Sequence, residues 1–127
     1  MTTAASFRGL RTAIYAVTDL AKAKAWYAEV LERPPYFDED FYVGFNIGGF
    51  ELGLVPEADA PMERDAAGVP FWGVDDAELA YQRLLTLGAV DHEPVQDVGG
   101  GVKIGAVRDP FGNMLGVVEN PHFHFDE

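Results

Sequence analysis

The sequence predicts an α+β domain made of two consecutive copies of one unit, in which a strand and a helix are followed by three more strands. The first observation is a repeat: Val17 and Asp19 match Val74 and Asp76, 57 positions further along, where an apolar strand again leads into a helix. The second is that glycine-rich turns separate apolar runs of strand length after each helix. Each copy leaves one sheet face bare, so we expect a cup-shaped, incompletely closed β-barrel around a shared interior.

All 127 residues fit one domain, because a composition that is 48% hydrophobic and 13% aromatic suffices for a single core. We place the first module at residues 9–56 and the second at residues 69–121. Between them, residues 57–68 are rich in alanine and acidic side chains and show no periodicity, which is typical of a linker crossing the surface. Residues 122–127 form a C-terminal tail.

The first module contains clear start and stop signals. Thr18-Asp19 supplies side chains that cap the start of a helix, and Pro34-Pro35 ends that helix because proline cannot donate to it. Gly48-Gly49 is the two-residue connection that a tight hairpin prefers. The expected elements are a strand at 10–17, an amphipathic helix at 20–31, a short strand at 36–38, and hairpin strands at 41–47 and 50–55.

The second module repeats this order. Asp75 and Glu78 have the spacing of a capping box at a helix start, and Pro70 places a missing donor near the start of the preceding strand. Gly99–Gly101 and Asp109–Asn113 are turns between apolar runs. The expected elements are a strand at 69–74, a helix at 75–87, and strands at 93–98, 102–107 and 114–119.

The formal net charge of −12, from 21 acidic and 9 basic residues, excludes several partners. A strongly negative surface repels phosphate backbones and anionic lipids, so we expect neither a nucleic-acid nor a membrane partner. The charge either favours a cationic ligand or is simply the acidic surface of a soluble protein. Disulfides are excluded because cysteine is absent. The N-terminus has no basic start or hydrophobic stretch of an export signal, and we therefore expect a cytoplasmic protein.

Taken together, these motifs resemble the vicinal oxygen chelate superfamily of glyoxalases, fosfomycin-resistance transferases, extradiol dioxygenases and bleomycin-resistance proteins. The resemblance rests on the doubled module, on Val-x-Asp-Leu before a helix that contains Trp26-Tyr27, on the Gly48-Gly49 hairpin, and on the turn Asp109-Pro110-Phe111-Gly112-Asn113. Each motif is common alone, but their order across the chain is specific. The resemblance implies the cup-shaped fold.

Catalytic members of that superfamily hold one divalent metal in the cup, and the resemblance implies where its ligands would lie. Those positions are five residues before each Val of Val-x-Asp, the last strand of the first module, and four residues after the turn glycine. They hold Thr12, Val69, Glu51 and Gly116. Threonine, valine and glycine do not replace the water shell of a divalent ion. We therefore predict no metal cofactor, and whether the chain is an enzyme stays open.

Alternation along the strands predicts which side chains face the cup. The expected ligand-binding residues are Thr12, Ile14, Glu51, Val69, Phe71, Met114, Gly116 and Val118. Such an apolar and aromatic set makes either a pocket for an organic molecule or an ordinary core. Glycine inside a strand often marks a close approach, so Gly116 favours open space. Glu51 is either a ligand contact or an exposed strand carboxylate.

Histidines offer little support for a metal site. His92 lies in a polar stretch after the second helix, where we expect a solvent-exposed loop. His122 and His124 alternate with phenylalanines in the tail. They could ligate a metal if the tail were a strand, or the tail could fold over the cup of its own or a neighbouring subunit.

Three functions remain compatible with the sequence. The leading one is a metal-independent protein, resembling the bleomycin-resistance type, that binds a small cationic or aromatic organic molecule in an apolar cup, as a homodimer. The second is a divergent metal-dependent lyase or dioxygenase in which Glu51 and a tail histidine rebuild a divalent metal site. The third is a non-catalytic interaction dimer with a filled cup. The identity of the ligand, and whether modules pair within one chain or between two, stay open.

Overall fold

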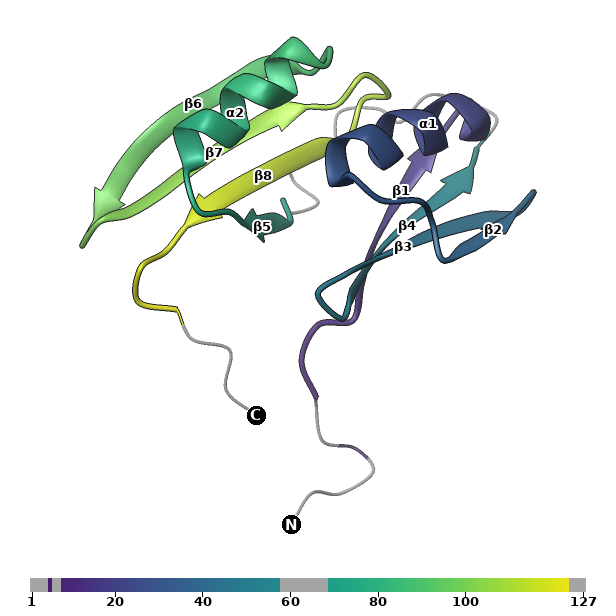
Figure 1. The fold of residues 1–127 in the computed structure, drawn as a ribbon, viewed down its shortest axis with the longest axis horizontal. Helices are drawn as coiled ribbons and strands as arrows, with labels where there is room; N and C mark the ends of the chain where they lie inside the picture. The colour runs from purple at the N-terminus through teal and green to yellow at the C-terminus, as the bar shows by residue number, and fades with distance from the viewer. Residues whose placement is uncertain (1–4, 6–7, 58–68, 124–127) are drawn as a thin grey trace.

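The computed structural model describes residues 5, 8–57 and 69–123 (Figure 1). Within these residues it forms two helices and eight strands. Their order is β1 (Thr12–Val17), α1 (Leu20–Leu31), β2 (Phe37–Glu39), β3 (Tyr42–Ile47), β4 (Phe50–Pro56), β5 (Phe71–Gly73), α2 (Ala77–Thr86), β6 (Val90–Gly99), β7 (Val102–Arg108) and β8 (Met114–Glu119).

The strands form two sheets with identical topology, which confirms the predicted pair of modules. The first sheet has the order β1-β4-β3-β2 and the second the order β5-β8-β7-β6. In each sheet the first and last strands of the module run parallel, and the other neighbours run antiparallel. No ladder joins β1 to β5 among the described residues, so the sheets remain separate and form an open cup rather than a barrel.

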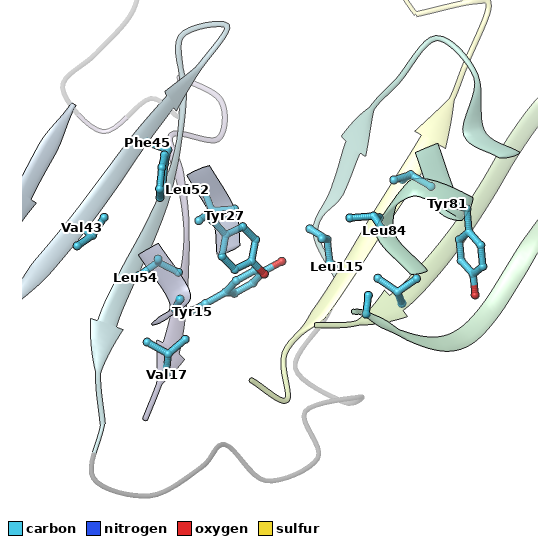
Figure 2. Close-up of a cluster of buried hydrophobic side chains, with 14 of the residues drawn as sticks. Tyr15, Val17, Tyr27, Val43, Phe45, Leu52, Leu54, Tyr81, Leu84 and Leu115 are labelled. Atoms are coloured by element: carbon cyan, nitrogen blue, oxygen red, sulfur yellow. The ribbon is translucent and has the colours of Figure 1, made fainter. Parts of the chain in front are cut away.

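Both helices lie on the same side of the two sheets, and the edge strands β1 and β5 lie toward the middle of the molecule (Figure 1). One face of each sheet packs against its own helix and builds the core (Figure 2). In the first module the buried sheet residues are Tyr15, Val17, Val43, Phe45, Leu52 and Leu54; in the second they include Val107, Leu115 and Val117. Within the described residues, the opposite face of each sheet has no helix over it.

The two helices begin with the same cap, and this corrects one prediction. The Asp19 side chain accepts from the Lys22 backbone N–H at 3.1 Å, as predicted. In α2 the cap is Asp76, which accepts from Leu79 N–H at 3.1 Å, and not Asp75. The capping-box spacing misplaced this start by one residue, whereas the repeat had paired Asp76 with Asp19. The Glu119 side chain accepts the Ala77 N–H at 2.9 Å and satisfies a further amide of that first turn.

Two strands of the second module differ in length from the prediction. β5 spans only Phe71–Gly73, because Pro70 has no N–H to donate, although its carbonyl accepts from Gly116 N–H at 3.0 Å. β6 runs from Val90 to Gly99, so His92 lies in an exposed strand rather than in a loop. Irregular pairing of β6 with β7 breaks the alternation of apolar residues that would have indicated the longer strand.

The turn Asp109–Asn113 connects the two modules within this chain. Asp109, only 2% exposed, accepts a hydrogen bond from the Tyr27 hydroxyl of α1 at 2.5 Å. The Asn113 amide donates to the Ala16 carbonyl of β1 at 2.9 Å. Burial is the largest influence on the carboxyl of Asp109 and raises its pKa, although the hydrogen bonds from Tyr27 and the turn backbone oppose that rise. The superfamily resemblance uses this turn to locate a metal ligand, but in this chain the turn has a structural role.

Candidate functional site

The sheet faces without helices, which we call the open faces, carry the predicted site residues. Thr12 and Ile14 of β1 lie beside Glu51 and Gly53 of β4. In the second module, β5 pairs with β8 so that Phe71 lies beside Gly116. Directly paired residues share a face of the sheet. Met114 and Val118 lie two positions to either side of Gly116 and therefore share its face.

The Glu51 carboxylate is the chemical centre of the first open face. Its Oε1 accepts from the Tyr42 hydroxyl at 2.8 Å, and its Oε2 accepts from the Tyr36 hydroxyl at 2.5 Å. Tyr42 opens β3, and Tyr36 immediately precedes β2. Two phenols from different segments thus converge on one carboxylate and fix its orientation.

Two paired glycines make room for this arrangement. Gly44 of β3 lies opposite Gly53 of β4. A Cβ atom on Gly53 would lie 2.1 Å from the Tyr42 hydroxyl oxygen, and one on Gly44 would lie 2.8 Å from the Glu51 Oε2. Any larger side chain at either position would have to displace the phenol or the carboxylate. The glycines therefore form the floor on which Tyr42 and Glu51 rest.

Glu51 is held in its charged form. Partial burial is the largest single influence and raises its pKa, but hydrogen bonds from Thr12, Tyr36 and Tyr42 together outweigh burial, and the pKa lies below its ordinary value. The hydrogen bond from Tyr36 to Glu51 raises the pKa of Tyr36. Burial is the largest cause of the raised pKa of Tyr42, and the hydrogen bond from Tyr42 to Glu51 is the next. At neutral pH the group is an anion with two neutral phenol donors.

A cavity of about 600 Å³ between the two modules reaches Glu51. Its volume lies in the range of small-molecule pockets. Apolar and aromatic side chains supply most of the wall, including Leu10, Phe50, Phe71, Trp72, Val118 and Phe123. The charged residues of the lining are Glu51, Asp75 and Arg11. This combination offers an apolar volume with a carboxylate at its edge.

Half of the predicted site residues line this cavity. They are Thr12, Glu51, Phe71 and Val118. Ile14 is 54% exposed on the open face outside the cavity, and Val69 is half-buried just before β5. Met114 is 5% exposed and Gly116 is buried. Ligand binding by the eight residues stays a prediction.

The expectation of open space at Gly116 is wrong. A Cβ atom on Gly116 would lie 2.5 Å from a ring carbon of Phe71, so that ring already occupies the space above the glycine. The close approach inferred from a glycine within a strand is real, but it is made by a neighbouring side chain of the same sheet.

Sequence reasoning did not identify Tyr36, Tyr42, Gly44 or Gly53 as parts of the site. Alternation along the β3–β4 hairpin could have placed Tyr42, Gly44 and Gly53 on the face of Glu51, because the Gly48-Gly49 turn sets the register. No sequence signal indicated that Tyr36, before a three-residue strand, reaches the same carboxylate.

A second hollow of about 750 Å³ lies beside the start of α1 and is more open to solvent. Trp26, Phe111 and Lys22 contribute to its wall. Trp26 donates to the Leu87 carbonyl at 2.7 Å, so its indole N–H is already used in joining the modules. None of the residues predicted for the site lines this hollow among the described part of the chain, and we attach no chemistry to it.

The residues present do not fit the metal centre that the fold family implies. Of the four implied positions, Glu51 alone has a charged side chain, and its two oxygens already accept from phenols. In residues 8–57 and 69–123, no three His, Asp or Glu side chains gather as metal ligands would. The His122 ring contacts the Gly100 carbonyl at 2.7 Å, and His124 lies outside the described residues. No step through a metal follows from this geometry.

The fold and the site can now be compared with known proteins. Residues 9–117 match the Glyoxalase/Bleomycin resistance protein/Dioxygenase superfamily. The chain belongs to this superfamily. This confirms the resemblance seen in the sequence, because the vicinal oxygen chelate fold is the fold of that superfamily. No curated protein sequence matches the chain.

Solved structures of the superfamily share the fold at low sequence identity. A glyoxalase-related enzyme from Fulvimarina pelagi has a TM-score of 0.73 and 17% identity over 94% of each chain. Lactoylglutathione lyase from Agrobacterium tumefaciens has a TM-score of 0.69 and 20% identity over 92% of this chain and 97% of that one. TioX from Micromonospora sp. ML1 has a TM-score of 0.65 and 21% identity over 88% and 98%. Such likenesses establish architecture and leave the chemistry to the site.

No helix in the described residues is long and apolar enough to cross a membrane.

Proposed function

We propose that this superfamily member binds a small aromatic cation, without a metal, in the cavity between its modules. The observation that carries the proposal is the Glu51 carboxylate, fixed by two phenols at the edge of a cavity with mainly apolar and aromatic walls. An apolar wall favours a ligand with apolar surface, and one anchored anion selects a positive group on it.

Charge supports a cation over an anion. The cavity wall has two carboxylates, Glu51 and Asp75, and one guanidinium, that of Arg11. Arg11 donates to the Arg8 carbonyl at 3.0 Å and is exposed. The chain as a whole has a formal charge of −12, so its field attracts cations toward any cleft.

The metal-independent part of the proposal rests on side-chain chemistry. Thr12, Val69 and Gly116 stand where the superfamily resemblance implies ligands, and a ligand side chain at position 116 would collide with Phe71. A metal-dependent lyase or dioxygenase would have to recruit donors that these positions do not supply.

A matched pair of aromatic probes tests this function. Isothermal titration calorimetry, with tryptophan fluorescence as a second signal, would compare N-methylquinolinium with quinoline, which is neutral at pH 7.5. We expect saturable binding of the cation at one site and at least tenfold weaker binding of the neutral ring, about 1.4 kcal/mol. Glu51→Gln should remove that preference, because the amide keeps the shape without the charge.

The control is Glu29→Gln, which makes the same charge change at an exposed position of α1. Equal affinity for the two probes in the unmodified protein would contradict the proposal, and so would an equal loss in both variants. Stoichiometric iron, manganese, nickel or zinc in protein purified without a histidine tag would contradict metal independence.

We also propose that the protein is a homodimer. Large apolar side chains are exposed along the faces without helices, among them Ile14, Phe37 and Phe71. Several large apolar side chains exposed on one side of a domain are typical of interaction sites when they form a patch. Sedimentation equilibrium should give twice the 13.9 kDa chain mass, and a monomer at micromolar concentration would refute the dimer.

A further inference from the structure

We propose that the cation recognised by Glu51 has no N–H donors: it is a quaternary ammonium group, or an N-alkylated ring nitrogen such as that of a pyridinium, on an apolar or aromatic body. The inference rests on the proposed function, because it specifies which cations the same site selects. Tyr36 and Tyr42 are then specificity-determining residues: they occupy acceptor positions of the carboxylate that a primary ammonium would use.

The geometry at the carboxylate limits what can bind there. A carboxylate offers about four lone-pair positions. Tyr42 takes one on Oε1 and Tyr36 takes one on Oε2, which leaves about two. A primary ammonium has three N–H groups to satisfy. It does not find three acceptors at this carboxylate without expelling a phenol.

Different contacts hold Tyr42 and Tyr36 in place beside Glu51. The Tyr42 ring lies over Gly53 and is partly buried. Tyr36 is 62% exposed, but its backbone N–H donates to the Gly44 carbonyl at 2.9 Å, which fixes its position beside the sheet. An N–H group that loses its acceptors on entering the site weakens binding, because its lost hydration is not replaced. A quaternary ammonium has no such group to lose.

Aromatic side chains on the same open face as Glu51 favour the same class of cation. Phe37 pairs with Gly44 and so shares the open face with Tyr42, at a ring-centroid distance of 6.1 Å. Phe41 packs against Phe37, also at 6.1 Å. The faces of aromatic rings attract cations, most strongly those that give up little hydration on binding, and recognition of quaternary ammonium by such groups is a known use of this interaction.

Two benzyl cations isolate the N–H groups. Benzyltrimethylammonium and benzylammonium are both charged at pH 7 and differ only in the methyl groups on nitrogen. By calorimetry we expect the unmodified protein to bind benzyltrimethylammonium at least tenfold more tightly. The double variant Tyr36→Phe/Tyr42→Phe frees both carboxylate oxygens, so benzylammonium should gain affinity and the ratio should fall at least fivefold.

The double variant also controls for the extra apolar surface of the methyl groups, because that contribution would leave the ratio unchanged. If the double variant does not fold, as judged by circular dichroism, the exposed single change Tyr36→Phe frees Oε2 and should lower the ratio by a smaller factor. A ratio near one in the unmodified protein, or a ratio that the variants do not change, overturns this inference. Binding of N-methylquinolinium in the same experiment would then leave the proposed function standing, whereas failure of all three cations to bind overturns both.

Discussion

The open faces of the two modules have the same backbone plan and opposite chemistry. Ile14 pairs with Gly53 in the first sheet and Phe71 pairs with Gly116 in the second, so the two glycines occupy equivalent positions. In both modules an aromatic ring covers the glycine: Tyr42 covers Gly53 and Phe71 covers Gly116. The repeat therefore preserves a covered glycine in the last strand of each module.

The modules diverge two residues earlier in the same strands. That position holds Glu51 in β4 and Met114 in β8. Glu51 is half-buried and has phenol donors, whereas Met114 is 5% exposed and lies outside the main core cluster. The covering ring also differs, because Tyr42 brings a hydroxyl and Phe71 does not. An asymmetric ligand site can thus arise from a symmetric scaffold by changing the residues beside an unchanged glycine.

Exchanging the side chains of Glu51 and Met114 gives the largest expected effect. Met114→Glu would bury a carboxylate opposite Arg108, whose guanidinium already donates to the Gly112 carbonyl, and should lower the free energy of unfolding by about 2–4 kcal/mol at pH 7. Such a carboxyl has a raised pKa in the folded state, so the loss should shrink as the pH falls toward 5. Urea denaturation at the two pH values measures it.

The reciprocal change sharpens the contrast. Glu51→Met removes a partly exposed carboxylate and should change stability by less than about 1 kcal/mol while it abolishes selection of N-methylquinolinium over quinoline. Met114→Leu is the size-matched control and should cost less than about 1.5 kcal/mol. Similar costs for Met114→Glu and Met114→Leu would show that burial does not distinguish the two positions.

The two covered glycines provide the next comparison. Gly53→Ala should force the Tyr42 ring away from Glu51 and cost about 1–2 kcal/mol, with weaker binding of N-methylquinolinium and unchanged binding of quinoline. Gly116→Ala should displace Phe71 from the cavity wall at a cost of about 1–3 kcal/mol and weaken both probes. Thermal unfolding and calorimetry would measure both effects.

Gly73→Ala is the matched control for these glycine changes. Gly73 lines the cavity itself, but a Cβ atom there would meet nothing within 4 Å. Gly73→Ala should therefore leave the binding of both probes within about twofold of that of the unmodified protein. If Gly53→Ala weakened the binding of quinoline as much as Gly116→Ala does, the two rings would serve the site alike and the proposed asymmetry would be wrong.

Much of the architecture was predictable because it depends on local signals. Asp19 and the Gly48-Gly49 turn fix the start of α1 and the β3–β4 hairpin from neighbouring residues alone. The repeat gave the doubled topology. The start of α2 was misplaced because Asp75 and Asp76 are adjacent possible caps, and local spacing alone favoured the wrong one.

The site was predicted less completely, because it depends on contacts between segments. Alternation placed Glu51 on the open face, but the approach of Tyr36 depends on the path of the chain between α1 and β2. The covering of Gly116 depends on the rotamer of Phe71 in a neighbouring strand. A glycine in a sequence indicates that something comes close, and only the packing shows what it is.

The smallest expected effect is the pH dependence of cation binding, because affinity at Glu51 should hardly change above pH 5. The pKa of Glu51 lies below its ordinary value of 4.5, because the hydrogen bonds from Thr12, Tyr36 and Tyr42 outweigh burial. Affinity for N-methylquinolinium, which does not titrate, should be flat between pH 8 and 5 and fall only as the carboxylate takes up its proton at lower pH. Calorimetry across that range, with circular dichroism to show that the protein stays folded, would measure it.

In Tyr36→Phe/Tyr42→Phe the fall should begin at higher pH, because two of the bonds that stabilise the anion are gone. A fall that begins at the same pH in both proteins would show that the phenols do not set the charge of Glu51. The difference between Glu51 and Met114 would then consist of the carboxylate alone.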